Sequence, residues 1–316
     1  MNKKGIVLSS LVYSLLVFFL LLVVALLAVM WYRQNAINIL KKRTLDIYEE
    51  EYVAESKLTS HLSINVGASG AYELKNDFYY FTGSNPQNWI EFGQVSLSDS
   101  TPLLWRIVKV DNNGIRLVYE GTKNGTLTPI EDGSLSSLSI FDTVDNKWTN
   151  PATLNSEIID WYNVDLYIRN KSNYVEDINW CTGGIINTSP LVTVDFISQE
   201  CIDQTTLGGT FIGESLPLVY SLLTASDYLL TSSDPLCVGP FLTECGNDNY
   251  LSKTYSYFTI NANAENNNQI WYVKDTGDIN LESISTSLKI RPVINIDPNI
   301  IWEDGVGSLS NPYQVK

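Results

Sequence analysis

The longest hydrophobic run of the chain covers residues 6–32, and its only polar side chains are three serines and two tyrosine hydroxyls. A helix of this length would reach roughly 40 Å, enough to cross a hydrocarbon core of about 30 Å. Lys3 and Lys4 precede the run without an acidic residue, as in a cytoplasmic leader. The pattern predicts a single-pass protein of the cell membrane, with a cytoplasmic N-terminus and an extracytoplasmic C-terminal domain.

Two alternatives to this placement start from the residues that follow the run. A cleaved signal peptide would have a shorter apolar region and a small-residue cleavage site, whereas Trp31 and Arg33 interrupt residues 28–36. Basic residues at 33 and 41–43 outnumber those of the leader, which would favour the opposite orientation. We prefer the extracytoplasmic placement because of the cysteines considered below.

The predicted helix does not need to end at the membrane surface. No glycine or proline occurs between Gly5 and Gly67, and residues 33–58 are rich in good helix formers. Apolar residues recur there at spacings of three, four and seven, although Thr44 and Glu51 interrupt the stripe. We therefore predict a transmembrane and stalk helix over residues 6–66, after a basic leader at residues 1–5.

A short basic leader ending in glycine, followed by a helix that is apolar first and amphipathic later, resembles type IV pilins and pseudopilins. The resemblance implies cleavage between Gly5 and Ile6, and packing of the helix beside other pilin-like helices. Ser10 stands where the family usually has glutamate, a departure seen in some minor subunits at filament tips. An ordinary uncleaved signal anchor is the alternative.

Residues 67–316 read as one domain of strands and turns. Residues 103–110 and 115–119 flank an Asp-Asn-Asn-Gly turn, which is a strong hairpin signal. Helical periodicity predicts a helix over residues 154–167 and a shorter one over residues 219–230. Further strands are predicted at residues 255–260, 270–274 and 289–296. The mixture predicts an α+β domain.

Five short segments of this domain resemble an uncharacterised bacterial family with a C-type-lectin-like fold. They are residues 80–86, 104–108, 180–184, 290–295 and 307–313. Domains of related fold serve as ligand-binding modules or, in the formylglycine-generating branch, as oxidases. The resemblance therefore implies a C-type-lectin-like mixed α+β domain, but a fold does not specify an activity.

Charge excludes one class of partner. The six basic residues up to Arg43 precede every acidic residue, so the rest of the chain carries 14 Lys and Arg against 35 Asp and Glu, a balance of −21. Such a domain repels the phosphates of nucleic acid. We expect no nucleic-acid binding.

The four cysteines, Cys181, Cys201, Cys237 and Cys245, lie in polar surroundings in the C-terminal part of the chain. Their even number predicts two disulfides and an oxidising compartment. Of the three connectivities, we favour Cys181–Cys201 with Cys237–Cys245. A zinc site is the rival, but no Cys-x-x-Cys pair occurs and the single histidine, His61, is distant.

Catalytic patterns are scarce. With one histidine in the chain, the Ser-His-Asp and Cys-His arrangements have no candidate in the globular part. We therefore expect no enzyme, no cofactor and no catalytic metal. A structural calcium ion remains open, since several aspartates supply the oxygens that calcium favours. They are Asp111, Asp248, Asp275, Asp278 and Asp297.

Binding is the remaining class, and the long polar loops of residues 180–269 are the predicted site. The asparagine-rich run 261–268 contributes Asn261, Asn263, Asn266 and Asn267, and Trp302 is expected to be exposed because acidic residues follow it. The ligand would be a surface protein or glycan. Three functions follow: a minor pilin-like subunit with an adhesin-like head, a simply anchored binding protein, and an ectoenzyme. The loops could also be tolerated insertions without function.

Overall fold

The computed structural model describes most of the chain from Lys57 to Lys316 and nine positions between Val17 and Trp31. The described ranges are 57–62, 71–75, 78–96, 99–111, 114–124, 128–129, 138–148, 153–165, 172–181, 184–185, 215–234, 236–237 and 243–316. The chain forms two compact units, Met1–Glu55 and Ser56–Lys316. The second unit begins ahead of residue 67, where the domain was predicted to start.

The first unit corrects the prediction of a membrane anchor. Its nine described residues are helical, apolar and exposed. Among all described residues, no helix is long and apolar enough to cross a membrane. This finding contradicts the predicted transmembrane and stalk helix over residues 6–66 and the single-pass placement in the cell membrane. Most of that range, including the proposed processing site at Gly5 and Ile6, lies outside the described residues.

The fold class also differs from the prediction. Of the described residues, 44% lie in strands and 20% in helices, so the protein is mostly β and the predicted α+β class is wrong. The α-helices are α2 (Leu58–His61), α3 (Thr153–Asp165) and α4 (Ala225–Leu230), with short 3-10 helices η2 (Ser172–Tyr174) and η4 (Thr243–Gly246). Most expected strands formed, whereas only α3 matches a predicted helix over most of its length.

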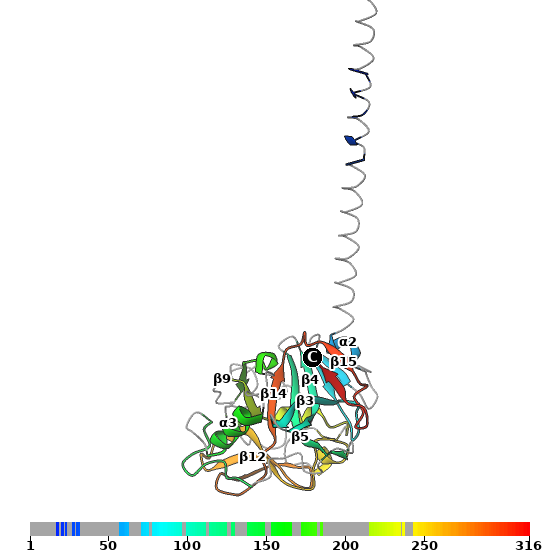
Figure 1. The fold of residues 1–316 in the computed structure, drawn as a ribbon. Helices are drawn as coiled ribbons and strands as arrows, with labels where there is room; N and C mark the ends of the chain where they lie inside the picture. Colours follow the sequence, from blue (N-terminus) through cyan, green and yellow to red (C-terminus); the bar gives the residue numbers. More distant parts are fainter. Residues whose placement is uncertain are drawn as a thin grey trace, which may run out of the picture. The chain divides into compact units, whose positions relative to one another are not determined.

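A ten-stranded sheet forms the centre of the second unit, with the strand order β10-β14-β5-β4-β3-β16-β15 (Figure 1). β1 pairs with β2, β2 also pairs with β4, and β6 pairs with β5. The bounds are β1 (Ala71–Lys75), β2 (Phe78–Phe81), β3 (Trp89–Ser96), β4 (Asp99–Asp111), β5 (Gly114–Asn124), β6 (Thr128–Pro129), β10 (Tyr220–Leu222), β14 (Pro292–Ile296), β15 (Trp302–Asp304) and β16 (Tyr313–Val315). The predicted hairpin is the β4–β5 pair, in which Asp111 lies opposite Gly114.

Two smaller groups of strands complete the fold. The order β13-β12-β11-β8 makes a four-stranded sheet, and β7 pairs with β9. Their bounds are β7 (Ile178–Cys181), β8 (Gly184–Ile185), β9 (Ser215–Leu218), β11 (Tyr257–Asn263), β12 (Gln269–Val273) and β13 (Ile279–Ser283). β11 and β12 are buried along nearly their whole length.

One face of the large sheet is apolar. Trp105 lies opposite Tyr119 across the β4–β5 pair, and residues directly opposite each other share a face of the sheet. The ring of Trp161, from α3, lies 5.8 Å from that of Trp105 and 5.3 Å from that of Tyr119. This aromatic contact explains why α3 packs against the sheet, as the predicted apolar stripe of the helix requires.

The region predicted as a helix over residues 219–230 divides into strand β10 and helix α4. The division occurs at Thr224, whose hydroxyl accepts a hydrogen bond from the Asp227 backbone at 2.9 Å. The Asp227 carboxylate accepts one from the Thr224 backbone N–H, which completes a capping box. A capping box of this kind begins a helix at the next residue, so β10 ends before it.

Residues 57–62 are an integral part of the second unit. The Leu58 backbone N–H donates to the Ile300 carbonyl at 2.9 Å, and Leu58 and Leu62 are both buried. The His61 carbonyl accepts a hydrogen bond from the Tyr313 hydroxyl. The first described segment of this unit is therefore docked on the C-terminal strands.

Candidate functional site

Helix α4 connects the two larger sheets through two side chains, those of Asp227 and Tyr228, and through the backbone N–H of Ala225. The Asp227 carboxylate accepts two hydrogen bonds from Arg116 of β5, at 2.7 and 3.0 Å, and one from the Tyr80 hydroxyl of β2. Toward the smaller sheet, the Ala225 backbone N–H donates to the Asn261 side chain at 2.8 Å. The Tyr228 hydroxyl donates to the Gly277 carbonyl in the β12–β13 turn. Six helical residues therefore hold two sheets together.

A second buried charge cluster lies on the same face of the large sheet. The two oxygens of Glu120 accept hydrogen bonds from Arg291 and from Lys253, the latter at 2.7 Å. Arg106 lies between the rings of Trp89 and Tyr250, at 4.3 and 4.5 Å from their centroids. Arg291 and Lys253 thus share one carboxylate, and the two aromatic faces attract the neighbouring Arg106.

Burial and neighbouring charges shift the pKa values of these groups in opposite directions. Burial tends to raise the pKa of Asp227, but the charges of Arg116 and Lys109 outweigh it and hold that pKa below its ordinary value. The same balance, set by Arg291 and Lys253, keeps the pKa of Glu120 low. Both carboxylates are therefore ionised at neutral pH.

The pKa of the buried Lys109 amine lies near physiological pH. Burial and the nearby Arg116 charge, opposed by the attraction of Asp111, together lower its pKa to about 8. The amine pairs with the Asp111 carboxylate at 2.7 Å, and both side chains are almost fully buried. The pair lies inside the fold rather than at an accessible surface.

These clusters favour a structural role over acid–base chemistry. Ionised carboxylates whose oxygens already accept hydrogen bonds from cations are poor proton acceptors, because accepting a proton would break the ion pair. In the described ranges, no group of three or more His, Cys, Asp and Glu side chains could hold a metal ion. Neither cluster therefore presents an open catalytic arrangement.

The predicted binding asparagines divide into two buried and two exposed residues. Asn261 and Asn263 lie in β11 and are buried. The Asn261 side chain accepts the hydrogen bond from Ala225, and the Asn263 side chain donates to Gln269 Oε1 at 2.9 Å. Both side chains therefore stabilise the fold. Asn266 and Asn267 lie in the β11–β12 turn and are exposed.

Asn146 holds this turn from a segment more than a hundred residues earlier. Its side-chain amide lies within hydrogen-bonding distance of three backbone carbonyls, those of Asn263 at 2.9 Å, Asn266 at 3.1 Å and Gln269 at 2.7 Å. Asn146 itself is buried, whereas its neighbours Val144 and Lys147 are exposed. One buried amide thus fixes the shape of a turn whose side chains face solvent.

A third segment joins the same surface at Ile284. The Ile284 backbone N–H donates to the Asn268 carbonyl at 3.0 Å, and the Ile284 carbonyl accepts from Phe141 N–H at 2.9 Å. Residues 143–147, 264–268 and 285–287 therefore lie next to one another around the buried Ile284. We call these three segments the asparagine face. No described residue bonds to the side-chain amide of Asn267, so it can engage a ligand.

Replacing Asn146 with alanine tests whether this residue organises the asparagine face. The substitution removes an NH2 group whose two N–H donors serve three nearby carbonyls, and we expect the free energy of unfolding to fall by about 1–3 kcal/mol. Backbone amides of residues 264–268 should exchange hydrogen faster. Urea unfolding and hydrogen exchange measure these effects, with the exposed Asn247→Ala as control. An Asn146→Ala protein with unchanged exchange in the turn would contradict the assignment.

Trp302 is half-buried rather than fully open. Its ring stacks on His61 with centroids 3.8 Å apart and an angle of 15° between planes. The indole N–H donates to the Gly305 carbonyl at 3.2 Å. One ring face is therefore occupied by the chain itself, which makes Trp302 part of the docking of residues 57–62. It lies outside the asparagine face.

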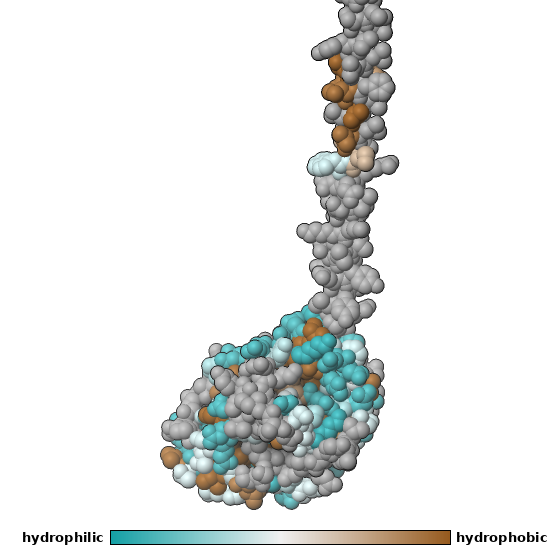
Figure 2. All heavy atoms as spheres, viewed as in Figure 1, coloured by the Kyte–Doolittle hydropathy of each residue, from teal (hydrophilic) through white to brown (hydrophobic). Residues whose placement is uncertain are grey.

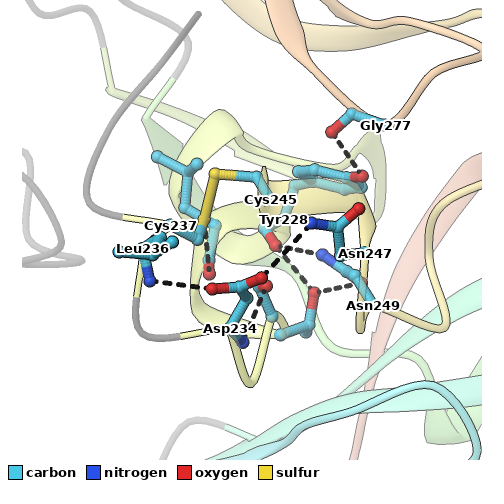
Figure 3. The surroundings of a disulfide bond; sticks show 11 residues. Tyr228, Asp234, Leu236, Cys237, Cys245, Asn247, Asn249 and Gly277 are labelled. Atoms are coloured by element: carbon cyan, nitrogen blue, oxygen red, sulfur yellow. Dashed lines mark hydrogen bonds between the residues drawn. A yellow bond between two sulfur atoms is a disulfide. The ribbon is translucent and has the colours of Figure 1, made fainter. Parts of the chain in front are cut away.

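Of the two predicted disulfides, the structure contains Cys237–Cys245 (Figure 3). Cys245 is buried in η4, and Cys237 is half-buried after α4. Cys181 ends β7, and its predicted partner Cys201 lies outside the described residues.

The aspartates considered for calcium have separate protein partners. Asp111 pairs with Lys109, Asp248 accepts a hydrogen bond from the Ser233 hydroxyl, and Asp278 accepts one from the Thr276 hydroxyl. Asp297 accepts two from Asn299, at 2.7 and 3.0 Å. The described residues contain no group of three or more such side chains that could hold a metal ion, and structural calcium stays a prediction.

Sequence reasoning missed Asn146 and Asp227, for different reasons. Asp227 follows Thr224 at the spacing of a capping box, a local signal that identifies the start of α4. No local signal identifies Asn146, because its acceptors lie between 117 and 123 residues away.

No protein-family model, curated protein or solved structure matches the chain.

Proposed function

We propose that the second unit is a binding domain that performs no chemistry, and that it recognises its ligand through the asparagine face. The observation that carries the proposal is the Asn146 clamp, in which one buried amide holds three carbonyls of an exposed turn. A turn fixed in this way loses little conformational entropy on binding, which favours affinity.

The chemistry of the asparagine face agrees with this role. It exposes amides at Asn266 and Asn267, hydroxyls at Thr143 and Ser285, and the apolar side chain of Val144. Amides and hydroxyls both donate and accept hydrogen bonds without carrying charge. These uncharged groups, beside the exposed charges of Lys147 and Glu265, suit a hydrogen-bonding ligand, and the candidates are a surface glycan or the polar surface of another protein.

Exposed hydrophobic side chains also occur close to the asparagine face along the chain. Many of the described residues in the view of Figure 2 are hydrophilic, with hydrophobic side chains between them. Large exposed hydrophobic side chains of the second unit occur at Leu138, Val144, Leu236, Val306 and Leu309. Two of them, Leu138 and Val144, belong to the segment that carries Asn146.

The experiment compares the full chain with an Asn266→Ala/Asn267→Ala variant on a glycan array and on immobilised bacterial surface fractions. Both residues are exposed, so the fold should be retained. We expect at least a tenfold loss of affinity, about 1.4 kcal/mol. The matched control replaces two exposed asparagines elsewhere, Asn247 and Asn299, and should bind normally. Undiminished binding by the folded double variant would contradict the proposal.

A further inference from the structure

The Cys237–Cys245 disulfide ties η4 to the segment that follows α4. Cys245 is 0% exposed, whereas Cys237 is half-buried and its neighbour Leu236 is 63% exposed. The two sulfurs therefore differ in their access to solvent. Figure 3 shows the bond beside Tyr228 and Asp234. We therefore expect a soluble reductant to reach the Cys237 sulfur first.

The Cys237–Cys245 disulfide also supports the β12–β13 turn, through η4. Gly246 at the end of η4 packs directly on Gly277, so closely that a methyl group on Gly246 would lie 2.6 Å from the Gly277 Cα. Gly277 also accepts the hydrogen bond from Tyr228 of α4. The disulfide and this backbone contact together hold η4 against α4 and against the turn.

The surroundings can accommodate the reduced cysteines. Cys237 Sγ lies 3.8 Å from the Leu229 carbonyl oxygen, so a thiol formed there finds a hydrogen-bond acceptor in place. Asp234, Glu244 and Asp248 lie nearby, and no salt bridge in the described part of the chain neutralises them. Their negative charge favours neutral thiols over thiolates after reduction.

We infer that the Cys237–Cys245 disulfide is a redox-sensitive clip that a dithiol reductant opens in the folded protein. The opening loosens η4 and the β12–β13 turn and leaves the large sheet intact. The inference is independent of the asparagine face, because the β12–β13 turn and the β11–β12 turn lie at opposite ends of β12.

The exchange proceeds in two balanced steps. A thiolate of the reductant attacks Cys237 Sγ, the bond between the two protein sulfurs breaks, and Cys245 leaves as a thiolate that takes a proton from water. The second thiolate of the reductant then attacks its own mixed-disulfide sulfur and displaces Cys237. The protein gains two electrons and two protons, and the reductant becomes a cyclic disulfide.

The test uses the full chain with dithiothreitol under native conditions, followed by alkylation and hydrogen exchange. We expect both cysteines to be alkylated, and exchange to become about tenfold faster in residues 243–246 and 274–278. Exchange in β4, β5 and β14 should stay unchanged. A Cys237→Ser/Cys245→Ser variant, never exposed to reductant, should show the same local change, which separates this bond from the other two cysteines.

Electrostatics provides a second readout. The acidic surroundings should make reduction by anionic glutathione slower than reduction by neutral 2-mercaptoethanol. Added salt screens these charges and should reduce the difference between the two reduction rates. Three results would overturn the inference. They are a bond that resists reductant until the protein is denatured, exchange that rises throughout the domain, and exchange that is unchanged in both segments of the double variant.

Discussion

Replacing Asp227 with asparagine is expected to lower the free energy of unfolding by about 3–5 kcal/mol, because it leaves a buried cation without its counter-charge. Arg116 directs two hydrogen bonds at this carboxylate, and Tyr80 adds a third. The same carboxylate completes the capping box with Thr224. Asparagine keeps the shape but lacks the charge. Chemical denaturation followed by tryptophan fluorescence measures the loss.

A matched control is Asp248→Asn. Asp248 also accepts a hydrogen bond from a hydroxyl, but it is partly exposed and forms no described salt bridge. Its replacement should change stability by less than about 0.5 kcal/mol. Equal effects of the two substitutions would show that the Arg116–Asp227 pair does not join the sheets.

The same carboxylate predicts the direction of the acid response. Because the pKa of Asp227 is held below its ordinary value in the folded protein, its stabilising contribution is complete above about pH 4, the ordinary value of an aspartate. The contribution is lost as pH falls through the folded pKa. The curve of stability against pH should therefore be flatter below about pH 4 in Asp227→Asn than in the parent protein.

Removing residues 1–71 is expected to destabilise the second unit by about 3–6 kcal/mol relative to a chain that begins at Ser56. The shorter chain loses the buried side chains of Leu58 and Leu62, each worth about 1.5–3 kcal/mol. It also exposes the Trp302 ring face that stacks on His61. Thermal and urea unfolding of the two chains measure the difference.

A point substitution separates this effect from chain length. In the chain that begins at Ser56, Leu58→Ala should cost about 2–5 kcal/mol, because its side chain is fully buried against the C-terminal strands. The neighbouring Thr59, which is only partly buried, provides the control as Thr59→Ala. If the chain that begins at Tyr72 were as stable as the longer one, the docking of residues 57–62 would not contribute to the fold.

Local patterns predicted the local structure of the domain. The Asp-Asn-Asn-Gly turn between two alternating runs identified the β4–β5 hairpin, because turn chemistry and strand periodicity agree there. The helical spacing of apolar residues identified α3. The fold class was wrong because several short strands, among them β7 to β10, carry too few residues for a periodic signal.

The buried charges could not be predicted from alternation. Arg116 and Glu120 occupy polar positions of an alternating strand, which in an antiparallel sheet normally face water. Here they face partners that come from far along the chain, Asp227 at a separation of 111 residues and Lys253 at 133. Only the tertiary fold reveals that this face of the sheet is covered.

The polar run that ends β11 was misleading for a similar reason. A stretch rich in asparagine reads as an exposed loop, yet Asn261 and Asn263 are strand residues whose side chains bond to Ala225 of α4 and to Gln269 of β12. Asn266 and Asn267, three and four residues beyond Asn263, are the exposed ones. Composition located the turn but could not separate its buried amides from its exposed ones.

The most direct test of the proposed function is a hydrogen-exchange footprint of the full chain, measured with and without a saturating glycan or surface protein obtained from the binding screen. Binding at the asparagine face should slow exchange in residues 143–147, 264–268 and 285–287, and leave residues 305–311 unchanged. Protection confined to other segments, with none in these three, would contradict the account.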